Sequence, residues 1–493
     1  MKWFFTRVIF AIVFINSVDL FSQIANSQII FGGNSFDYGI DLVQTSDSGY
    51  LVLGSSGSYS TSNDIILWHV DKDLEYQWHR IFGTNDADNA VKLCPMGVDT
   101  FLVLCSTLHP GTGNYNLWTF VVLPNGDTIN SHVFDHSVWE FPSCVLKSTD
   151  GGFLMSGTTY DSDDSEADVF FLKVDQNFSE VWYNRILRPG KDSVASILEF
   201  NSKYYVVGTS LSPFGNQSDI SFLKLNSTGF VELENYFGGS NDDVGADIVK
   251  FDDGNLLIGG QSKSFGSFPT FFNSYLLKID TNGVFVWPQA QSSNDALNYR
   301  MKRILLDQDQ NIFAFFSRKG AVESDYHLFK NNAGGFYIGS AGYGTFGNEY
   351  LGNAILTSDK GVALIGTTSD YAFGLENFYF VKADSLLTNT ISPSIEVGIY
   401  DETKAEKTFD LFPSIARDWV TVKFPFHTTP TVFQVYNSIG ALVLEKRISC
   451  NDNSPTCDFI FQVDDFPPGI YFAKIYVNAG AYQSIQKFVV LDK

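Results

Sequence analysis

The side chains that could carry out catalysis are scattered along this sequence and form no familiar motif. Of its seven histidines, only His132 and His136 have the spacing with which two imidazoles on one helix face bind a metal ion. Val133 and Phe134 lie between them and favour a strand, so the two rings are not expected to share a face. No GxSxG, HExxH, phosphate-binding loop or dinucleotide fingerprint occurs in a fitting strand–helix context. We therefore expect no enzyme activity.

One acidic segment could hold Ca²⁺ through clustered oxygen ligands. Its carboxylates are Asp161, Asp163, Asp164 and Glu166. The segment lacks a loop glycine, and Leu172 stands where an EF-hand loop needs glutamate. A solvated hairpin loop accounts for the same charges. No cofactor is therefore expected, and Ca²⁺ is the one ion left open.

Four other carboxylates recur at similar positions, shortly after a Phe-Gly or Tyr-Gly pair. They are Asp37, Asp88, Asp243 and Glu349. Because a unique active site need not repeat, the recurrence favours hydrogen bonding within turns. The alternative is a ring of carboxylates that binds a cation or a sugar.

Aromatic side chains are the better candidates for contact with a ligand. Trp78, Trp182 and Trp287 recur at nearly equal spacings, which is typical of packing between structural repeats. The candidates are therefore the aromatics that do not recur: Trp118, Trp139, Tyr115, Phe265, Phe268, Phe271 and Phe272. The last four lie in an inserted loop, where exposed aromatic residues often bind partners. The alternative is that this loop caps a neighbouring repeat.

The composition indicates an all-β protein that does not bind nucleic acid. Of 493 residues, 44% are hydrophobic, 16% are aromatic and 41 are glycine, as expected for many short strands and tight turns. The chain has 32 Lys and Arg residues against 55 Asp and Glu residues, a net charge of −23. This balance disfavours nucleic acid and anionic membranes, because both require a basic surface.

These residues are positioned by a repeat with a period of about 52 residues. In each copy a polar residue precedes an alternating apolar run, at Asp64, Asn116, Asp168, Asp219, Asn273, Asp325 and Asn377. Each copy is expected to contain four antiparallel strands, which in the first copy are 40–45, 50–55, 64–70 and 76–82. Seven such units predict a seven-bladed β-propeller. A stacked β-solenoid would normally have a shorter period.

The two ends of the repeat array are expected to close the ring. The segment 29–33 matches the ends of later fourth strands, whereas the seventh copy has only a degraded fourth strand at 386–389. A strand from the N-terminus would complete the last blade and remove an open edge. The propeller is therefore predicted to span 28–389.

The segments outside the propeller predict export and a second domain. Residues 1–27 read as a signal peptide, because Lys2 and Arg7 precede an apolar run too short to span a bilayer. No later stretch resembles a transmembrane segment. Residues 390–408 read as a linker, and 409–493 alternate apolar and polar residues as a small antiparallel β-sandwich does.

Five cysteines in an exported chain leave at least one without a partner. Cys450 and Cys457 flank a polar loop and are expected to form a disulfide. Cys94 and Cys105 lie on strands expected to pair, but they are diagonally offset, and disulfide geometry tolerates little offset. The pairing of Cys94, Cys105 and Cys144 is therefore left open.

The C-terminal segment resembles the type A sorting domain of the type IX secretion system of Gram-negative bacteria. The matching positions are Phe412, Pro413, Gly440, Pro468, Gly469, Tyr471, Lys487 and Lys493. Ser414 and Ile415 replace the Asn-Pro usual in that family. The resemblance implies passage through the outer membrane and recognition of residues 409–493 by the type IX translocon. It also implies removal of this domain, with surface attachment or release.

The repeats are similar to those of secreted propellers and loosely similar to kelch propellers, which implies a fold and no reaction. We therefore predict a secreted or cell-surface seven-bladed β-propeller followed by a small C-terminal β-sandwich. Its propeller is expected to bind an extracellular protein or glycan without catalysis, as an adhesion or binding module. The alternative is a carbohydrate-active enzyme, a glycoside hydrolase or lyase, with its site in the funnel of the propeller.

Overall fold

The computed structural model is an all-β chain whose strands run from β1 to β37, and the residues that it describes contain no helix. These residues are 27–33, 35–59, 62–109, 113–136, 139–160, 166–213, 215–266, 268–291, 296–320, 323–345, 347–369, 376–387, 394–395, 410–412, 415–416, 419–425, 431–437, 442–448, 456–477 and 482–490. That part of the chain has no helix able to cross a membrane. The expected signal peptide and most of the expected linker lie outside it.

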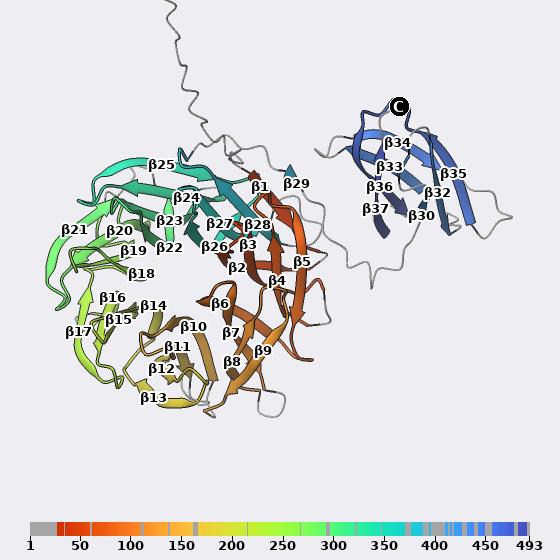
Figure 1. The fold of residues 1–493 in the computed structure, drawn as a ribbon. Helices are drawn as coiled ribbons and strands as arrows, with labels where there is room; N and C mark the ends of the chain where they lie inside the picture. The colour runs from red at the N-terminus through yellow and green to blue at the C-terminus, as the bar shows by residue number, and fades with distance from the viewer. Residues whose placement is uncertain are drawn as a thin grey trace, which may run out of the picture.

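Six consecutive groups of four strands form antiparallel sheets with one shared order, from the innermost strand to the outermost (Figure 1). The strands of blades 1 to 3 are β2 (Asp37–Gln44), β3 (Tyr50–Ser56), β4 (Asp64–Val70), β5 (Tyr76–Phe82), β6 (Asp88–Gly97), β7 (Thr100–Leu108), β8 (Tyr115–Val122), β9 (Thr128–Phe134), β10 (Trp139–Lys147), β11 (Phe153–Tyr160), β12 (Asp168–Val174) and β13 (Glu180–Ile186). The strands of blades 4 to 6 are β14 (Ser193–Phe200), β15 (Lys203–Leu211), β16 (Ser218–Leu225), β17 (Val231–Phe237), β18 (Asp243–Lys250), β19 (Leu256–Ser262), β20 (Asn273–Ile279), β21 (Phe285–Gln291), β22 (Asn298–Leu306), β23 (Ile312–Lys319), β24 (Ser324–Asn331) and β25 (Tyr337–Tyr343).

The seventh blade takes its outer strand from the N-terminal end of the described chain. It contains β26 (Glu349–Leu356), β27 (Val362–Thr368) and β28 (Asn377–Ala383), and β1 (Ser27–Phe31) pairs antiparallel with β28. The register runs from Ser27 opposite Lys382 to Phe31 opposite Phe378. The predicted ring closure and the seven-bladed propeller are thereby confirmed. A two-residue strand inside the expected linker, β29 (Ser394–Ile395), pairs parallel with β1.

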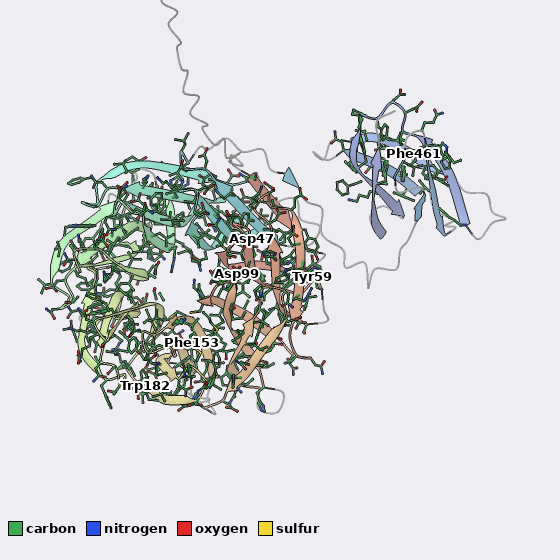
Figure 2. The ribbon with its side chains drawn as sticks, viewed as in Figure 1. Asp47, Tyr59, Asp99, Phe153, Trp182 and Phe461 are labelled. Atoms are coloured by element: carbon green, nitrogen blue, oxygen red, sulfur yellow. The ribbon has the colours of Figure 1, made fainter. Side chains whose placement is uncertain are left out.

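The middle strands read as continuous apolar runs because neighbouring blades cover both of their faces. Every residue of β3, β12 and β20 is buried. One cluster of buried hydrophobic residues lies at each of the seven interfaces between blades. The core of the propeller is therefore a ring of apolar layers between sheets, and Phe153 belongs to the layer between blades 2 and 3 (Figure 2).

The innermost strands contact one another around the ring and surround its centre (Figure 1). Each carries a β-bulge at the same place, where one extra residue interrupts the register. The extra residues are Ile40, Val91, Ser143, Ala195, Ala246, Lys302 and Gly352. A bulge leaves its residue unpaired with the neighbour strand, so these seven positions lie on the inner edges of the blades, where Ile40, Val91 and Ala246 also pack against the apolar layers.

The strand order gives the propeller two different faces. We call the face with the first-to-second and third-to-fourth strand turns the turn face. The opposite face, with the second-to-third strand loops and the connections between blades, is the loop face. Bonds between blades recur on the turn face in every second blade, where a backbone N–H of the first turn donates to a side chain of the next blade. The pairs are Ser46 with Asp99 at 2.8 Å, Thr149 with Glu199 at 2.7 Å, Asp252 with Gln310 at 2.9 Å and Ser358 with Gln44 at 2.8 Å.

The recurring tryptophans belong to the same alternation. Trp78, Trp182 and Trp287 lie on the outer strands of blades 1, 3 and 5, against the turn glycines Gly126, Gly229 and Gly335 of the following blades. Figure 2 shows Trp182 on the rim of the ring, and its indole N–H donates to the Ser227 carbonyl at 3.3 Å. These tryptophans therefore pack between blades, as predicted.

The C-terminal part forms two facing sheets around one core. One sheet contains β30 (Asp410–Phe412), β32 (Trp419–Pro425) and β35 (Thr456–Gln462). The other contains β31 (Ile415–Ala416), β37 (Tyr482–Val490), β36 (Gly469–Val477), β33 (Thr431–Asn437) and β34 (Leu442–Ile448). Phe433, Phe461 and Phe488 pack between them, and Figure 2 shows Phe461 inside this domain. The predicted β-sandwich is therefore confirmed.

Three cysteines are buried free thiols, Cys94, Cys105 and Cys144. Cys94 lies opposite Leu102 and Cys105 lies opposite Ala90, so the two thiols are not cross-strand partners. Burial raises the pKa of Cys94 to about 11 and also raises that of Cys144, which keeps both as unreactive thiols. The expected disulfide involves Cys450 and the side chain of Cys457, which lie outside the described residues.

Candidate binding face

The loop face carries the start of every inner strand, and a buried carboxylate stands there in six of the seven blades. These residues are Asp37, Asp88, Glu140, Asp192, Asp243 and Glu349. In each case the residue four positions earlier approaches the carboxylate with a donor: Gly33 N, Thr84 N, His136 Nδ1, Arg188 Nη1, Gly239 N and Thr345 N. The recurrence thus has the physical cause expected from the sequence, namely bonding within the connection between two blades.

Serine and threonine hydroxyls satisfy more of these carboxylate oxygens. Asp243 accepts from Gly239 N at 2.8 Å and from Ser264 Oγ at 2.7 Å, and Glu349 accepts from Thr345 Oγ1 at 2.6 Å and Thr368 Oγ1 at 2.7 Å. Burial raises the pKa of Asp37 and of Glu349, and these hydrogen bonds oppose the shift. One oxygen each of Asp88, Glu140 and Asp192 has no hydrogen-bond partner among the described residues. All six carboxylates are buried, so they do not form an open ring for a cation or a sugar.

Just beyond the carboxylate in six blades, and beyond Tyr299 in blade 6, one residue of every inner strand stands at the channel mouth. These residues are Tyr38, Asn89, Phe141, Ser193, Val244, Arg300 and Tyr350. Tyr38 and Tyr350 are exposed, and Tyr38 stacks with Phe36 at 6.1 Å between ring centroids. Burial, together with the negative charge of Glu376, raises the pKa of Tyr38 to about 12, so this phenol is neutral at physiological pH.

An aromatic cluster continues from this mouth across blades 2 and 3. It consists of Tyr115, Trp139, Phe141 and Tyr160, and we call it the Trp139 cluster. Phe141 lies 5.1 Å from Tyr115 and 5.7 Å from Tyr160, and Tyr115 lies 6.3 Å from Trp139, between ring centroids. Trp139 is 40% exposed, and it lies opposite Tyr160 in the β10–β11 pair. The sheet therefore fixes one exposed and three half-buried aromatic rings next to one another on the loop face.

Trp118, the other single tryptophan expected to contact a ligand, lies elsewhere. Its ring packs against Phe120 at 5.0 Å in the layer between blades 1 and 2. Its indole N–H donates to Ser131 Oγ at 2.9 Å. Trp118 is thus a packing residue, and the structure does not bring it together with Trp139.

The inserted loop of blade 5 is anchored to its surroundings. Phe265 stacks on Tyr275 at 5.0 Å and is 36% exposed. Phe272 lies 4.5 Å beneath Lys263 Nζ, and its backbone bonds to Asn298 and Tyr299 of blade 6. Phe268 and Phe271 are half-buried, and both carbonyls accept from Asn273 Nδ2. Part of this loop therefore does cap the next blade, and Phe265 is its most exposed aromatic residue.

The candidate calcium ligands fall mostly outside the described residues. Asp161, Asp163 and Asp164 lie there, and Glu166 is exposed at its edge. Among the residues that the structure describes, no three His, Cys, Asp or Glu side chains are grouped so as to hold a metal ion. Glu166 itself lies just before β12, at the loop face.

The two histidines with metal-like spacing have separate roles. His132 stacks on Phe178 at 5.0 Å. His136 lies between two carboxylates, with Nδ1 2.9 Å from Glu140 Oε1 and Nε2 3.1 Å from Glu180 Oε2, and its ring stacks on Tyr183. Burial opposes protonation, but the bonds and charges of Glu140 and Glu180 outweigh it and raise the pKa of His136.

Of the expected sorting positions, the structure describes the block around Tyr471 best. Tyr471 is buried in the core of the C-terminal sandwich, and its hydroxyl donates to the Pro467 carbonyl at 2.6 Å. Pro468 and Gly469 are exposed beside it. Pro413, Gly440 and Lys493, and the side chains of Phe412 and Lys487, lie outside the described residues.

Residues 410–491 match the family described as "Secretion system C-terminal sorting domain". They are therefore a type IX C-terminal sorting domain, which interacts with the type IX secretion system. This domain indicates export of the protein to the cell surface or the extracellular space. No curated protein matches the chain.

Several solved structures are similar to this chain at low identity. PorZ, a surface component of the type IX secretion system of Porphyromonas gingivalis, is 12% identical with a TM-score of 0.42, over 94% of this chain and 60% of PorZ. The β-propeller domain of the trilobed protease from Pyrococcus furiosus is 10% identical with a TM-score of 0.42, over 73% and 98% of the two chains. A Bacteroides caccae protein of unknown function is 11% identical with a TM-score of 0.39, over 60% and 93%. The propeller is identified here from the strand pairing of this chain alone.

Proposed function

We propose that the propeller is the exported cargo of the sorting domain and that it binds an extracellular glycan or protein through its loop face without catalysing a reaction. The observation that carries this proposal is the Trp139 cluster. Large aromatic side chains are usually buried, so a group of four that lies partly open to solvent, with Trp139 exposed, supports a surface that a partner covers. Binding residues also concentrate on loops and strand ends that a rigid scaffold positions.

A glycan is the partner that the cluster fits better. The rings lie at the loop-face ends of β8, β10 and β11, where backbone pairing fixes them, and Trp139 and Phe141 belong to an innermost strand. A flat ring offers an apolar face, whereas the Tyr115 and Tyr160 hydroxyls and the indole N–H of Trp139 offer polar edges. Sugars present the same combination of apolar C–H faces and polar rims. Few side chains would need to be ordered on binding, which favours affinity.

The alternative, a carbohydrate-active enzyme, would need two carboxyl groups about 5–10 Å apart that face a shared space. The recurring carboxylates at the channel mouth accept hydrogen bonds inside the blade connections, which supports the binding role. Glu180 is a carboxylate with solvent access, but it contacts His136 and is the first residue of the outer strand β13, beside a turn of the turn face. An assay for release of reducing ends from the glycans that bind would test this alternative.

The direct test is a glycan array probed with the full-length protein and with single variants. Trp139→Ala removes the most exposed ring of the cluster, and we expect at least a ~10-fold loss of binding. The matched control is Phe336→Ala, because Phe336 is a 67% exposed aromatic residue on the turn face. Unchanged binding by Trp139→Ala, or no binding by the unaltered protein, would contradict the proposal. Phe265→Ala tests whether the inserted loop of blade 5 contributes to binding in addition to the Trp139 cluster.

Delivery is tested separately by cell fractionation. A chain that ends at residue 408 lacks the matched sorting domain, so it is expected to stay inside the cell envelope while the full chain reaches the surface or the medium. The propeller closes through β1 and β28, so its fold does not depend on the strands beyond residue 408. Surface delivery of the truncated chain would contradict the assignment of the sorting signal to 410–491.

A further inference from the structure

The channel through the propeller differs in charge from the rest of the molecule. Six of the seven bulge residues on the inner edges of the blades are neutral, and the seventh is Lys302. Arg300 precedes it at the channel mouth, and Lys92 and Arg303 directly follow the bulges of blades 2 and 6. A protein with a net charge of −23 thus places four cations around one narrow space.

Two of these cations are neutralised by buried aspartates. Asp41 Oδ2 lies 3.4 Å from Lys92 Nζ, and Asp247 Oδ2 lies 3.5 Å from Arg303 Nη1. Both aspartates also bind a backbone N–H of the following blade, from Leu93 at 2.8 Å and from Ile304 at 2.9 Å. The same arrangement occurs twice in the ring, and in it the carboxylates are already fully used.

The aspartates accept further bonds from the preceding blades. Asn353 Nδ2 donates to Asp41 Oδ1, and Ser196 Oγ donates to Asp247 Oδ1 at 2.6 Å. Each aspartate therefore joins three blades. Each carboxylate already accepts hydrogen bonds on both of its oxygens, so neither is available to a further cation in the channel.

Lys302 and Arg300 form no ion pair within the part of the chain that the structure describes. The Lys302 side chain is exposed to solvent, yet the surrounding blades and the charges of Lys92 and Arg300 lower its pKa. Lys302 and Arg300 lie two residues apart on the innermost strand of blade 6, and both are exposed. They are therefore two exposed cations on the inner edge of one blade.

We propose that the channel is a second binding site, in which Lys302 and Arg300 hold an anionic group such as a carboxylate, sulfate or phosphate. An anion placed between them removes their mutual repulsion and completes the pairing that the chain leaves open. Cations in a water-filled space with protein walls attract an anion more strongly than cations on an open surface. The site does not depend on glycan binding by the Trp139 cluster.

The test is calorimetric titration of the full chain with inorganic sulfate, with inorganic phosphate and with galacturonate, at constant ionic strength set by NaCl. These three probes separate tetrahedral oxyanions from a sugar carboxylate. We expect one binding site per chain, and a loss of affinity of about 10-fold or more for Lys302→Gln. Lys302→Arg should retain binding, because it keeps the charge and the donors.

Two measurements keep the result unambiguous. Without an anion, Lys302→Gln should unfold at the same temperature as the unaltered protein or higher, because one repelling charge is removed. Lys72→Gln, on an exposed turn of blade 1, is the control for overall charge and should bind the anion as the unaltered chain does. The proposal is overturned if none of the three anions binds the unaltered chain, or if Lys302→Gln binds them with unchanged affinity.

Discussion

The two faces of this propeller use the same strands for different purposes. On the turn face, short turns of nearly uniform length bond one blade to the next, for example through Thr149 and Glu199. On the loop face the connections vary in length and carry exposed aromatic residues, of which Trp139 is the clearest. Both faces bond neighbouring blades, and the turn face also carries exposed aromatic residues such as Phe336. The loop face differs in its longer connections and in the grouping of Trp139 with three further rings, and binding residues concentrate in such connections.

Within the turn face, alternate blades reach the same packing by different residues. In blades 3, 5 and 7 a buried lysine of the third strand pairs with an aspartate of the first turn, at 2.8–2.9 Å, in the pairs Lys173–Asp150, Lys278–Asp253 and Lys382–Asp359. In blades 2, 4 and 6 a turn glycine makes room for a tryptophan of the preceding blade. The contacts on this face therefore alternate from one blade to the next, so they recur every two blades, whereas the sequence repeat corresponds to one blade.

The largest expected loss of stability comes from Gly229→Ala on the turn face. Gly229 has a φ of +81°, and a Cβ there would lie 2.6 Å from Trp182 Cζ3, so the substitution adds both backbone strain and a clash. We expect the free energy of unfolding to fall by about 2–4 kcal/mol. Urea denaturation measures this change.

The matched control for that substitution is Gly254→Ala. Gly254 has a similar φ of +85°, but nothing lies within 4 Å of a Cβ placed there. The cost should therefore be about 1 kcal/mol, from backbone strain alone. Equal losses in the two variants would show that the tryptophan contact does not fasten the blades.

A smaller effect is expected from Asp359→Asn. Partial burial opposes ionisation, but hydrogen bonds from Lys382 and Thr357 lower the pKa of the Asp359 carboxyl. A lowered pKa means that the carboxylate stabilises the fold above its unfolded pKa, and that this contribution is lost as pH falls through the folded pKa. We expect a loss of about 1–2 kcal/mol near neutral pH and no loss near pH 2.

Thermal unfolding across this pH range measures that dependence. Asp309→Asn is the control, because Asp309 is an exposed carboxylate in a turn of blade 6. Its substitution should leave stability unchanged at every pH. If Asp359→Asn still lowers stability at low pH, the loss does not arise from the ion pair with Lys382.

His136 is a charged contact between the connection that precedes blade 3 and two carboxylates of that blade. Its raised pKa means that the imidazolium stabilises the fold below the unfolded pKa of ~6.5, and that this is lost as pH rises through the folded pKa. His136→Gln should lower the free energy of unfolding by about 0.5–1 kcal/mol near pH 5.5 and have little effect near pH 9. Chemical denaturation at the two pH values distinguishes this result from a pH-independent loss of packing on Tyr183.

The smallest change in stability is expected for Trp139→Ala, although its effect on binding should be large. Exposed side chains outside the core usually change stability by about 0.5 kcal/mol when they are replaced. The ring contacts with Tyr115 and Phe141 are partly open to solvent, so their loss should cost no more than about 1 kcal/mol. A loss of several kcal/mol in urea denaturation would make the cluster a part of the core.

The sequence was sufficient for the fold because the repeat carries the hydrogen-bonding and burial pattern in every copy. The strands predicted at 50–55, 64–70 and 76–82 are observed almost residue for residue, whereas the inner strand begins at Asp37 and not at 40. The difference arises from the bulge, which hides the alternation at Gly39 and Ile40. The ring closure was also readable, because β1 repeats the residues of a fourth strand.

The candidate site was only partly readable, because single residues do not reveal which neighbour they meet. Trp118 and Trp139 have the same residue type and no repeat partner, yet one is packed between blades and the other is exposed. The position of Trp139 at the start of an inner strand, two residues before Phe141, was a usable signal. Lys302 could not have been identified without the bulge register, and His136 could not have been linked to Glu180 on another strand.

The most direct test of this account measures binding and stability together in Trp139→Ala and Glu199→Ala. Glu199 accepts two hydrogen bonds from Thr149 on the turn face and lies away from the aromatic cluster. We predict that Trp139→Ala abolishes glycan binding with little change in unfolding temperature, and that Glu199→Ala lowers the unfolding temperature while binding persists. If both variants lose binding and stability in parallel, the two faces do not have separate roles and the account is contradicted.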